Sequence, residues 1–343
     1  MRRADGSPRQ PCLPGGNIPI LIGLTLSLGG GGGAMAVRQS PQRDRAAPRR
    51  HGKALALPMA AAVLLLASPA PAGGGADFSG CRDEKNPTLV YAACTRAIST
   101  PGIGVQKLSA AYFNRAIVMA GYGKFREAIA DLTRAIELDP DHHKALSERG
   151  RLYRDEGDLE LAMDDFNRAI DLAPDVSGYF SNRGLTEKLR GNLVAALADY
   201  NEALHLDPDN ETALHRRGAL HREMKNFGDA LADLQRALAI ERDNAAIMLE
   251  IGLVYADQGR HVKAIAYFDD AIERRPRYAE AWLQRGLSYA ALDSHDLAVR
   301  DLQMAEGLGL SGTELKTMLV EQRRLASNKY RRSHPAIPHA LQP

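Results

Sequence analysis

Arginine and aspartate recur together at a separation of sixteen residues. Five such pairs stand in the chain: Arg115 with Asp131, Arg149 with Asp165, Arg183 with Asp199, Arg217 with Asp233, and Arg285 with Asp301. Where another pair would fall in the same register, Ile251 and Tyr267 stand instead, so the two residue types disappear together. Their joint loss predicts structural ion pairs, which if partly exposed orient the chain more than they stabilise it. An arginine ladder that binds acidic ligands is the alternative interpretation.

The cysteines indicate a second kind of chemistry. Cys81 and Cys94 lie close together behind a segment with the features of an export signal, whereas Cys12 lies ahead of it. An even pair of cysteines in an exported protein indicates a disulfide, which would stabilise the fold by about 3 kcal/mol in the chain-entropy model. The run Phe78-Ser79-Gly80-Cys81 also has a faint likeness to a lipobox. Lipidation of Cys81 is therefore the alternative.

No residues are spaced for catalysis, phosphate binding or a metal. The sequence lacks G-x-S-x-G, P-loop and H-E-x-x-H patterns, and no Lys-Ser or Lys-Thr follows its glycine run, Gly29 to Gly33. His142 and His143 are expected at the surface, while His215 and His221 are six residues apart and point to different faces of a helix. No zinc-type cysteine cluster exists. We expect a non-catalytic protein without cofactor or metal.

These side chains are carried by a repeated unit of 34 residues, which occurs six times between residues 109 and 312. The units begin at Ser109, His143, Ser177, Glu211, Ala245 and Ala279. Two alanines recur in every unit with a large apolar residue between them, as Phe166 stands between Ala162 and Ala169. Five units carry a glycine twelve residues before the first alanine, and four close with proline. Small residues let two helices approach closely and proline ends a helix, so each unit predicts a helix–turn–helix.

The turns and junctions carry signals of their own. Gly157-Asp158 and Gly191-Asn192 predict the turn between the two helices of a unit. Aspartates follow the unit junctions where a helix N-cap is wanted. These predicted caps are Asp141, Asp175, Asp209 and Asp243.

The spacing of small, large and proline positions over residues 109–312 resembles the tetratricopeptide-repeat family. The resemblance implies an all-α fold, in which helix–turn–helix units stack into a right-handed superhelical solenoid. It also implies a concave face that binds other proteins and is lined by the first helix of each unit.

Side chains of two kinds should line this concave face. Units two to four offer mainly basic side chains, and units five and six offer leucines at the matching positions. The candidate partner-binding residues are Lys144, Arg151, Arg154, Asn182, Lys188, Arg216, Arg222, Leu253 and Leu287. A basic half followed by an apolar half suits an acidic, amphipathic segment of a partner. A solvated face with ordinary core leucines is the alternative.

Residues 73–108 look like a degenerate capping hairpin ahead of the array. Asn86-Pro87 predicts an N-cap and a first helical residue. A disulfide from Cys81 to Cys94 would tie the two helices of this hairpin together. The arrangement is similar to exported bacterial repeat proteins in which a Cys-containing hairpin precedes the array.

The C-terminal side predicts one more helix and a tail. Residues 313–332 have an apolar face and should cap the last unit, with Ser311 and Glu314 as a candidate capping box. Residues 333–343 contain three prolines and no periodicity, which predicts disorder.

The first 72 residues predict a disordered leader plus a signal peptide. The net charge of +2 divides into +7 over residues 1–72 and −5 over the remainder. Arg49, Arg50 and Lys53 precede an apolar run that ends in Ala70-Pro71-Ala72. This order of charged, apolar and small residues is typical of a signal peptide cleaved after the last alanine. An uncleaved N-terminal anchor is the alternative, and Met35 is an alternative translation start.

Together these features predict a non-catalytic scaffold or adaptor of the bacterial cell envelope, periplasmic or secreted, that binds proteins or peptide segments. The acidic remainder of the chain argues against nucleic acid. A lipid-anchored or enzyme-regulating subunit that acts on a cell-wall hydrolase is the alternative. Membrane association is expected only with a lipidated Cys81 or an uncleaved signal. The partner, the pathway and the oligomeric state do not follow from the sequence.

Overall fold

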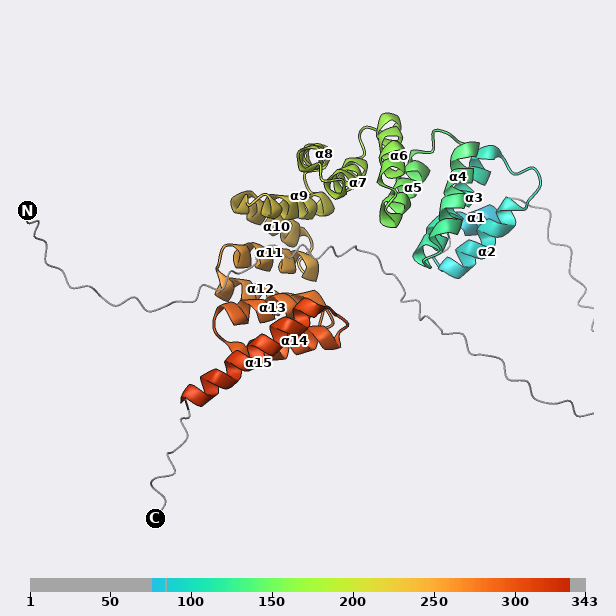
Figure 1. Ribbon diagram of the computed structural model, residues 1–343. Coiled ribbons are helices and arrows are strands. Elements are labelled where there is room, and N and C mark those ends of the chain that lie inside the picture. The colour runs from blue at the N-terminus through green and yellow to red at the C-terminus, as the bar shows by residue number, and fades with distance from the viewer. Residues whose placement is uncertain (1–75, 84, 334–343) are drawn as a thin grey trace, which may run out of the picture. The chain divides into compact units, whose positions relative to one another are not determined.

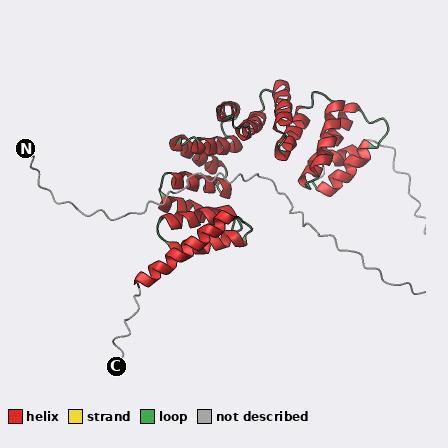
Figure 2. Cartoon of the chain, in the orientation of Figure 1, coloured by secondary structure: helices red, strands yellow, loops and turns green. Residues whose placement is uncertain are grey.

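A computed structural model describes residues 76–83 and 85–333, and over these residues it is built from helices without strands (Figures 1 and 2). The helices are α1 (Ala76–Asp83), α2 (Pro87–Ile98), α3 (Val105–Gly121), α4 (Phe125–Leu138), α5 (His143–Glu156), α6 (Leu159–Leu172), α7 (Ser177–Leu189), α8 (Leu193–Leu206), α9 (Glu211–Glu223), α10 (Phe227–Ile240), α11 (Ala245–Asp257), α12 (His261–Arg274), α13 (Ala279–Ala291), α14 (His295–Gly307) and α15 (Thr313–Ser333). The predicted all-α fold is confirmed. The predicted leader, signal peptide and cleavage site, and residues 334–343 of the tail, lie outside the described residues.

The helices stack as a solenoid of hairpins. From α3 to α14 each odd-numbered helix packs against the even-numbered helix that follows it, and that second helix packs against the first helix of the next hairpin. The first helices α5, α7, α9, α11 and α13 also contact one another in succession. They therefore form one continuous surface, which we call the first-helix face.

Each hairpin closes over a large buried side chain from its second helix. Phe268 of α12 and Tyr200 of α8 are fully buried. A Cβ added to Gly252 of α11 would lie 2.4 Å from Cε1 of Phe268, and one added to Gly184 of α7 would lie 2.8 Å from Cε1 of Tyr200. The close approach of the two helices thus requires the recurring glycine. Because the interior is densely packed, neither helix can move away to make room for a larger side chain.

The turn inside each hairpin uses one residue in the left-handed region. Gly157 and Gly191 have φ angles of 93° and 84°, as the predicted turns require. Lys225 and Asp293 take the same position in units four and six with φ angles of 62° and 55°. A residue with a Cβ is strained in this conformation, whereas glycine is not.

The helices that follow the unit junctions begin one residue later than predicted. The N-cap residues of α5, α7, α9 and α11 are His142, Val176, Asn210 and Asn244. The prediction that Asp141, Asp175, Asp209 and Asp243 are the caps was wrong. In α7, α9 and α11 the next residue still has extended backbone angles, so the aspartate lies outside the first turn. In α5, α9 and α11 the side chain of this later residue accepts a backbone N–H bond.

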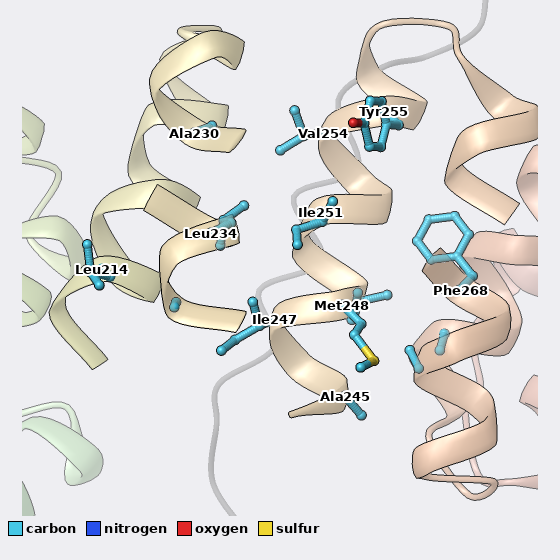
Figure 3. Packing of buried hydrophobic residues seen from close by; sticks show 14 of the residues in the cluster. Leu214, Ala230, Leu234, Ala245, Ile247, Met248, Ile251, Val254, Tyr255 and Phe268 are labelled. Atoms are coloured by element: carbon cyan, nitrogen blue, oxygen red, sulfur yellow. The ribbon is translucent and has the colours of Figure 1, made fainter. Parts of the chain in front are cut away.

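The largest buried cluster among the described residues joins the hairpins of units three to six (Figure 3). Ile247 and Ile251 point from α11 towards Leu234 of α10, while Phe268 lies on the other side of α11. Ile251 is fully buried and Tyr267 packs partly buried against the same cluster. At this junction the missing Arg–Asp pair is therefore replaced by apolar packing.

The N-terminal hairpin is cross-linked. The Sγ atoms of Cys81 in α1 and Cys94 in α2 are 2.06 Å apart and form the disulfide that the sequence predicts. Asn86 caps α2 as predicted, because its side chain accepts from the backbone N–H groups of Thr88 and Leu89.

The last helix, α15, covers the end of the array. Leu315 and Leu319 are buried against Leu283 and Leu302 of the sixth hairpin. The predicted capping box is not formed, since Glu314 instead accepts a hydrogen bond from the Thr313 hydroxyl at 3.4 Å. Among the described helices, α15 included, none is both long and apolar enough to cross a bilayer.

Candidate functional site

The five Arg–Asp pairs join the two helices of their own hairpins. Arg149 donates from Nε to Oδ2 and from Nη2 to Oδ1 of Asp165, both at 2.8 Å. The other four pairs have the same two-bond geometry. The aspartate side chains are only 4% to 10% exposed. Hydrogen bonding to Asp131 and Asp301 raises the pKa of Arg115 and Arg285.

Each of these arginines makes a third contact outside its own hairpin. Nη1 of Arg149 donates to Thr133 of the preceding hairpin at 3.0 Å, and Arg183 and Arg217 reach an asparagine at the equivalent position. Arg285 meets Asp269 there. Since Nε, Nη1 and Nη2 are all engaged within the protein, this geometry favours the structural interpretation over a ladder for acidic ligands.

Four of the predicted partner-binding cations are paired with carboxylates of the same face, Arg154 among them through Asp155 at 2.8 Å. Arg151 bonds Glu148 and Asp155 at 2.9 and 3.2 Å. Lys188 lies 2.9 Å from Glu223. Arg222 bonds Glu250 and Asp257 at 3.1 and 2.9 Å. The expected basic half of the face is thus not a continuous positive surface, because acidic residues of the same helix and of the next first helix neutralise much of its charge.

The remaining predicted residues differ in surroundings. Lys144 is exposed, and Asn182 is half-buried on α7. Leu253 and Leu287 are also half-buried and pack against the core clusters of units five and six. The leucines therefore contribute to the hairpin cores as well as to the first-helix face.

Arg154 and Arg216 differ from these cations, because Arg154 keeps a buried donor without a partner and Arg216 bonds only neutral groups. Arg154 donates from Nε and Nη2 to Asp155, at 3.1 and 2.8 Å, but its buried Nη1 has no partner. Arg216 bonds only neutral groups, the backbone carbonyl and hydroxyl of Ser181 and Oδ1 of Asn182, at 2.9 to 3.2 Å. Burial lowers the pKa of Arg216, with a smaller contribution from the like charge of Arg154.

A cavity of about 600 Å³ lies beside the disulfide at the N-terminal end of the described chain. Its apolar walls include Val90, Phe113 and Ile117, and Arg82 and Lys85 also line it. The sequence did not indicate this cavity, because it forms only where the capping hairpin meets α3.

The sequence-based prediction also did not include the acidic partners of these cations, although the sequence carries a signal for them. Cations in one unit meet acids 28 or 35 residues later, as Arg222 meets Glu250 and Asp257, and as Lys188 meets Glu223. These separations are close to one repeat length and place the residues on adjacent first helices. No group of three or more His, Cys, Asp or Glu side chains in the described part of the chain is arranged to hold a metal ion.

Comparisons with known proteins place these features in a family. The family described as Tetratricopeptide repeat matches residues 113–177, 215–276 and 263–309. No curated protein matches the sequence.

Solved structures share the fold at low sequence identity. A tetratricopeptide-repeat protein from Parabacteroides merdae is 18% identical with a TM-score of 0.58, over 73% of this chain and 100% of that one. PilW, described as a type IV pilus biogenesis factor, is 22% identical with a TM-score of 0.57, over 62% and 98% of the two chains. PilF of Pseudomonas aeruginosa is 19% identical with a TM-score of 0.55, over 64% and 99%.

The family match and the shared fold of these structures agree with the stacked helical hairpins of this chain. The chain is therefore a member of the tetratricopeptide-repeat proteins.

Proposed function

We propose that this protein is a non-catalytic scaffold that binds a segment of a partner protein along its first-helix face. Tetratricopeptide-repeat proteins bind other proteins or peptides. The observation that carries the proposal is the continuity of the first helices, which contact one another from α5 to α13. A surface of this kind can accept an extended or helical segment over several hairpins, with each hairpin adding a few side-chain contacts.

The side chains of the face suit an acidic, amphipathic partner segment. Arg154 and Arg216 have unused donor capacity in the middle of the face. Half-buried Leu253 and Leu287 offer apolar surface further along the array. An acidic group followed by an apolar anchor would match both regions, since a few buried contacts usually provide most of the binding free energy.

An exported location also belongs to this proposal. A disulfide persists in the periplasm or outside the cell and is rare in the reducing cytosol, and Cys81 and Cys94 are bonded. The bond also argues against a lipid anchor at Cys81, because a thiol that carries a diacylglyceryl group cannot form a disulfide.

Intact-mass analysis of the natural protein separates these locations. Export with a disulfide predicts a chain that begins at Gly73. The mass of this chain should be lower by two hydrogens before reduction than after it. A diacylglyceryl mass on Cys81 would support the lipid-anchored alternative, and an N-terminus upstream of Arg50 would contradict cleavage.

Site-specific photo-crosslinking tests the binding face. Ala219 occupies the same repeat position as Arg151, whose partners lie on the first-helix face. Val262 at the start of α12 is 72% exposed and serves as a control on a second helix. A photoreactive residue at position 219 should capture a discrete partner in an envelope extract, whereas one at 262 should not. Equal capture at both positions, or capture at 262 alone, would contradict the proposal.

A further inference from the structure

The N-terminal hairpin has a disulfide at the positions where the next hairpin has two large side chains. Cys94 stands 38 residues before Leu132, the large residue of unit one, and both lie just ahead of the run Thr-Arg-Ala-Ile. Cys81 stands the same distance before Met119, which is buried in the same cluster as Leu132. The bond between the two cysteines ties α1 to α2. Two cysteine side chains fill less space than a methionine and a leucine, so room is left beside the disulfide.

This room is the cavity of about 600 Å³ between α1, α2 and α3, which contact one another at the N-terminal end of the described helices (Figure 1). Cys81 lines the cavity from α1, Val90 from α2, and Phe113 and Ile117 from α3. Phe113 is half-buried, and Ile117 is 40% exposed. A hollow of this size with mainly apolar walls that reach the solvent is typical of a binding site.

A second cavity, of about 230 Å³, shares the side chain of Tyr122 with the first. Thr88, Tyr91 and Met119 also line it. The hydroxyl groups of Thr88 and Tyr122 lie 3.3 Å apart, and this contact holds the tyrosine ring between the two cavities. In an extended segment, every second side chain lies on the same side. Two hollows that share one wall therefore suit two apolar side chains of one segment better than they suit a single small molecule.

The charged residues around the two cavities have one sign. Arg82 and Lys85 line the first cavity and Lys124 lines the second, and none of the described residues that line either cavity is acidic. The chain after residue 72 carries a net charge of −5, so this end differs in charge from the protein as a whole. Complementary charge favours a segment that carries carboxylates over a basic one.

We propose that the two cavities form a docking site for a segment of a partner protein in which two apolar side chains are flanked by carboxylates. The apolar side chains enter the cavities on either side of Tyr122, and the carboxylates lie near Arg82, Lys85 and Lys124. The site is built by α1 to α3, so it is separate from the first-helix face of α5 to α13. The inference rests on the proposed protein-binding function and adds a second recognition point at the N-terminal end of the array.

Calorimetric titration of the full-length protein with short peptides tests the apolar part of the site. The probe is acetyl-Glu-Phe-Ser-Leu-Glu-amide, which should bind, whereas the peptide with serine in place of Phe and Leu should not. Ile117→Ser should weaken binding about fivefold, because it removes apolar contact from the cavity wall. Ile240→Ser is the matched control, since Ile240 lies at the end of α10 and is 45% exposed, and it should leave the affinity unchanged.

The charged part of the site is tested with the glutamine peptide, acetyl-Gln-Phe-Ser-Leu-Gln-amide. Lys85→Glu should weaken binding of the glutamate peptide about threefold at low ionic strength and leave the glutamine peptide unaffected. Lys316→Glu makes the same change at an exposed residue of α15 and should affect neither peptide. Bound glutamate peptide should slow hydrogen exchange in α1 to α3 and leave α9 to α12 unchanged.

Three results would overturn the proposal. They are equal affinity for the serine-substituted peptide, equal losses in Ile117→Ser and Ile240→Ser, and protection from exchange outside α1 to α3. Tighter binding of sodium dodecanoate than of the glutamate peptide would also overturn it, because the cavities would then belong to a small amphipathic molecule. Peptide binding at α1 to α3 without photo-crosslinking at position 219 would keep this site and reject the first-helix face, and the reverse result would do the opposite.

Discussion

At the residue scale, the Arg–Asp pairs are more deeply buried than the sequence predicts. The sequence predicts partly exposed pairs of little energetic value, yet each aspartate is nearly buried and accepts two bonds. Hydrogen bonds to charged groups contribute about 1.5–3 kcal/mol when the partners are shielded from water, against about 0–1 kcal/mol for exposed pairs. The pairs therefore stabilise the hairpins as well as orienting them.

A double-mutant cycle at Arg183 and Asp199 measures this contribution. We expect a coupling of about 1–2 kcal/mol in the free energy of unfolding, because the two side chains share a bidentate contact. Arg190 and Glu160 form an exposed control pair at 3.0 Å, for which the coupling should be below about 0.5 kcal/mol. Chemical denaturation of the four variants of each pair supplies the numbers. Additive effects at Arg183 and Asp199 would mean that these residues do not interact in solution.

The co-occurrence of arginine and aspartate indicated these pairs from sequence, but it could not indicate the third contact of each arginine. The residue that accepts it changes from Thr133 to Asn167, Asn201 and Asp269 along the array. With Thr95, which accepts from Arg115, five residues of three types make this contact, so no single residue type marks the position.

At the element scale, the glycines of the first helices determine how closely each hairpin can pack. Gly252→Ala should destabilise the protein by about 1–3 kcal/mol, because its Cβ would overlap the ring of buried Phe268. Gly228 is a matched control in α10, since an added Cβ there meets nothing within 4 Å. Gly228→Ala should be neutral or stabilising by up to about 1 kcal/mol, as alanine favours helix. Thermal unfolding of both variants checks the difference, and equal effects would contradict the packing argument.

The turns permit a stabilising substitution at Lys225. This exposed residue has a φ of 62° in a position that is glycine in four of the six units. Lys225→Gly removes the strain of a left-handed residue but adds freedom to the unfolded chain, with an expected net gain of roughly 0.5–1 kcal/mol. Gly157→Ala is the reverse change and should lower the free energy of unfolding by a similar amount. The midpoints of urea unfolding measure both changes in stability. A destabilised Lys225→Gly variant would show that the lysine side chain itself contributes to stability.

Sequence predicted the hairpins well because their signals are local and repeated six times. The helix starts after the junctions were less accurate, because aspartate and asparagine are both good caps and stand side by side, as in Asp209-Asn210. Only the local backbone decides which of the two lies at the first turn. The structure selects Asn210 and Asn244 there.

At the scale of the whole molecule, a solenoid transmits stability only between neighbouring units. The disulfide should therefore stabilise the N-terminal hairpin and the walls of the cavity beside it against local unfolding. It should have little effect on the stability of hairpins further along the array. In a Cys81→Ser, Cys94→Ser variant, hydrogen exchange should increase in α1 and α2 while α9 to α12 exchange as before. Exchange measured by mass spectrometry on both proteins tests this. A uniform increase along the array would contradict nearest-neighbour behaviour.

The same reasoning applies at the other end, where α15 shields the apolar surface of the sixth hairpin. Leu319 is 3% exposed and belongs to the cluster with Leu283 and Leu302, whereas the adjacent Val320 is 66% exposed. Leu319→Asp puts an unpaired carboxylate into this cluster, and the loss of apolar burial alone costs about 2 kcal/mol. Val320→Asp adds the same charge at the surface and should change stability by less than about 0.5 kcal/mol.

Because only the last interface is weakened, Leu319→Asp should release α15 and loosen α13 and α14, while α5 to α8 keep their protection in hydrogen exchange. Newly exposed leucines should also make this variant self-associate, which light scattering detects. Should Leu319→Asp behave like Val320→Asp in both measurements, α15 would be an appendage, and the sixth hairpin would terminate the solenoid without a cap.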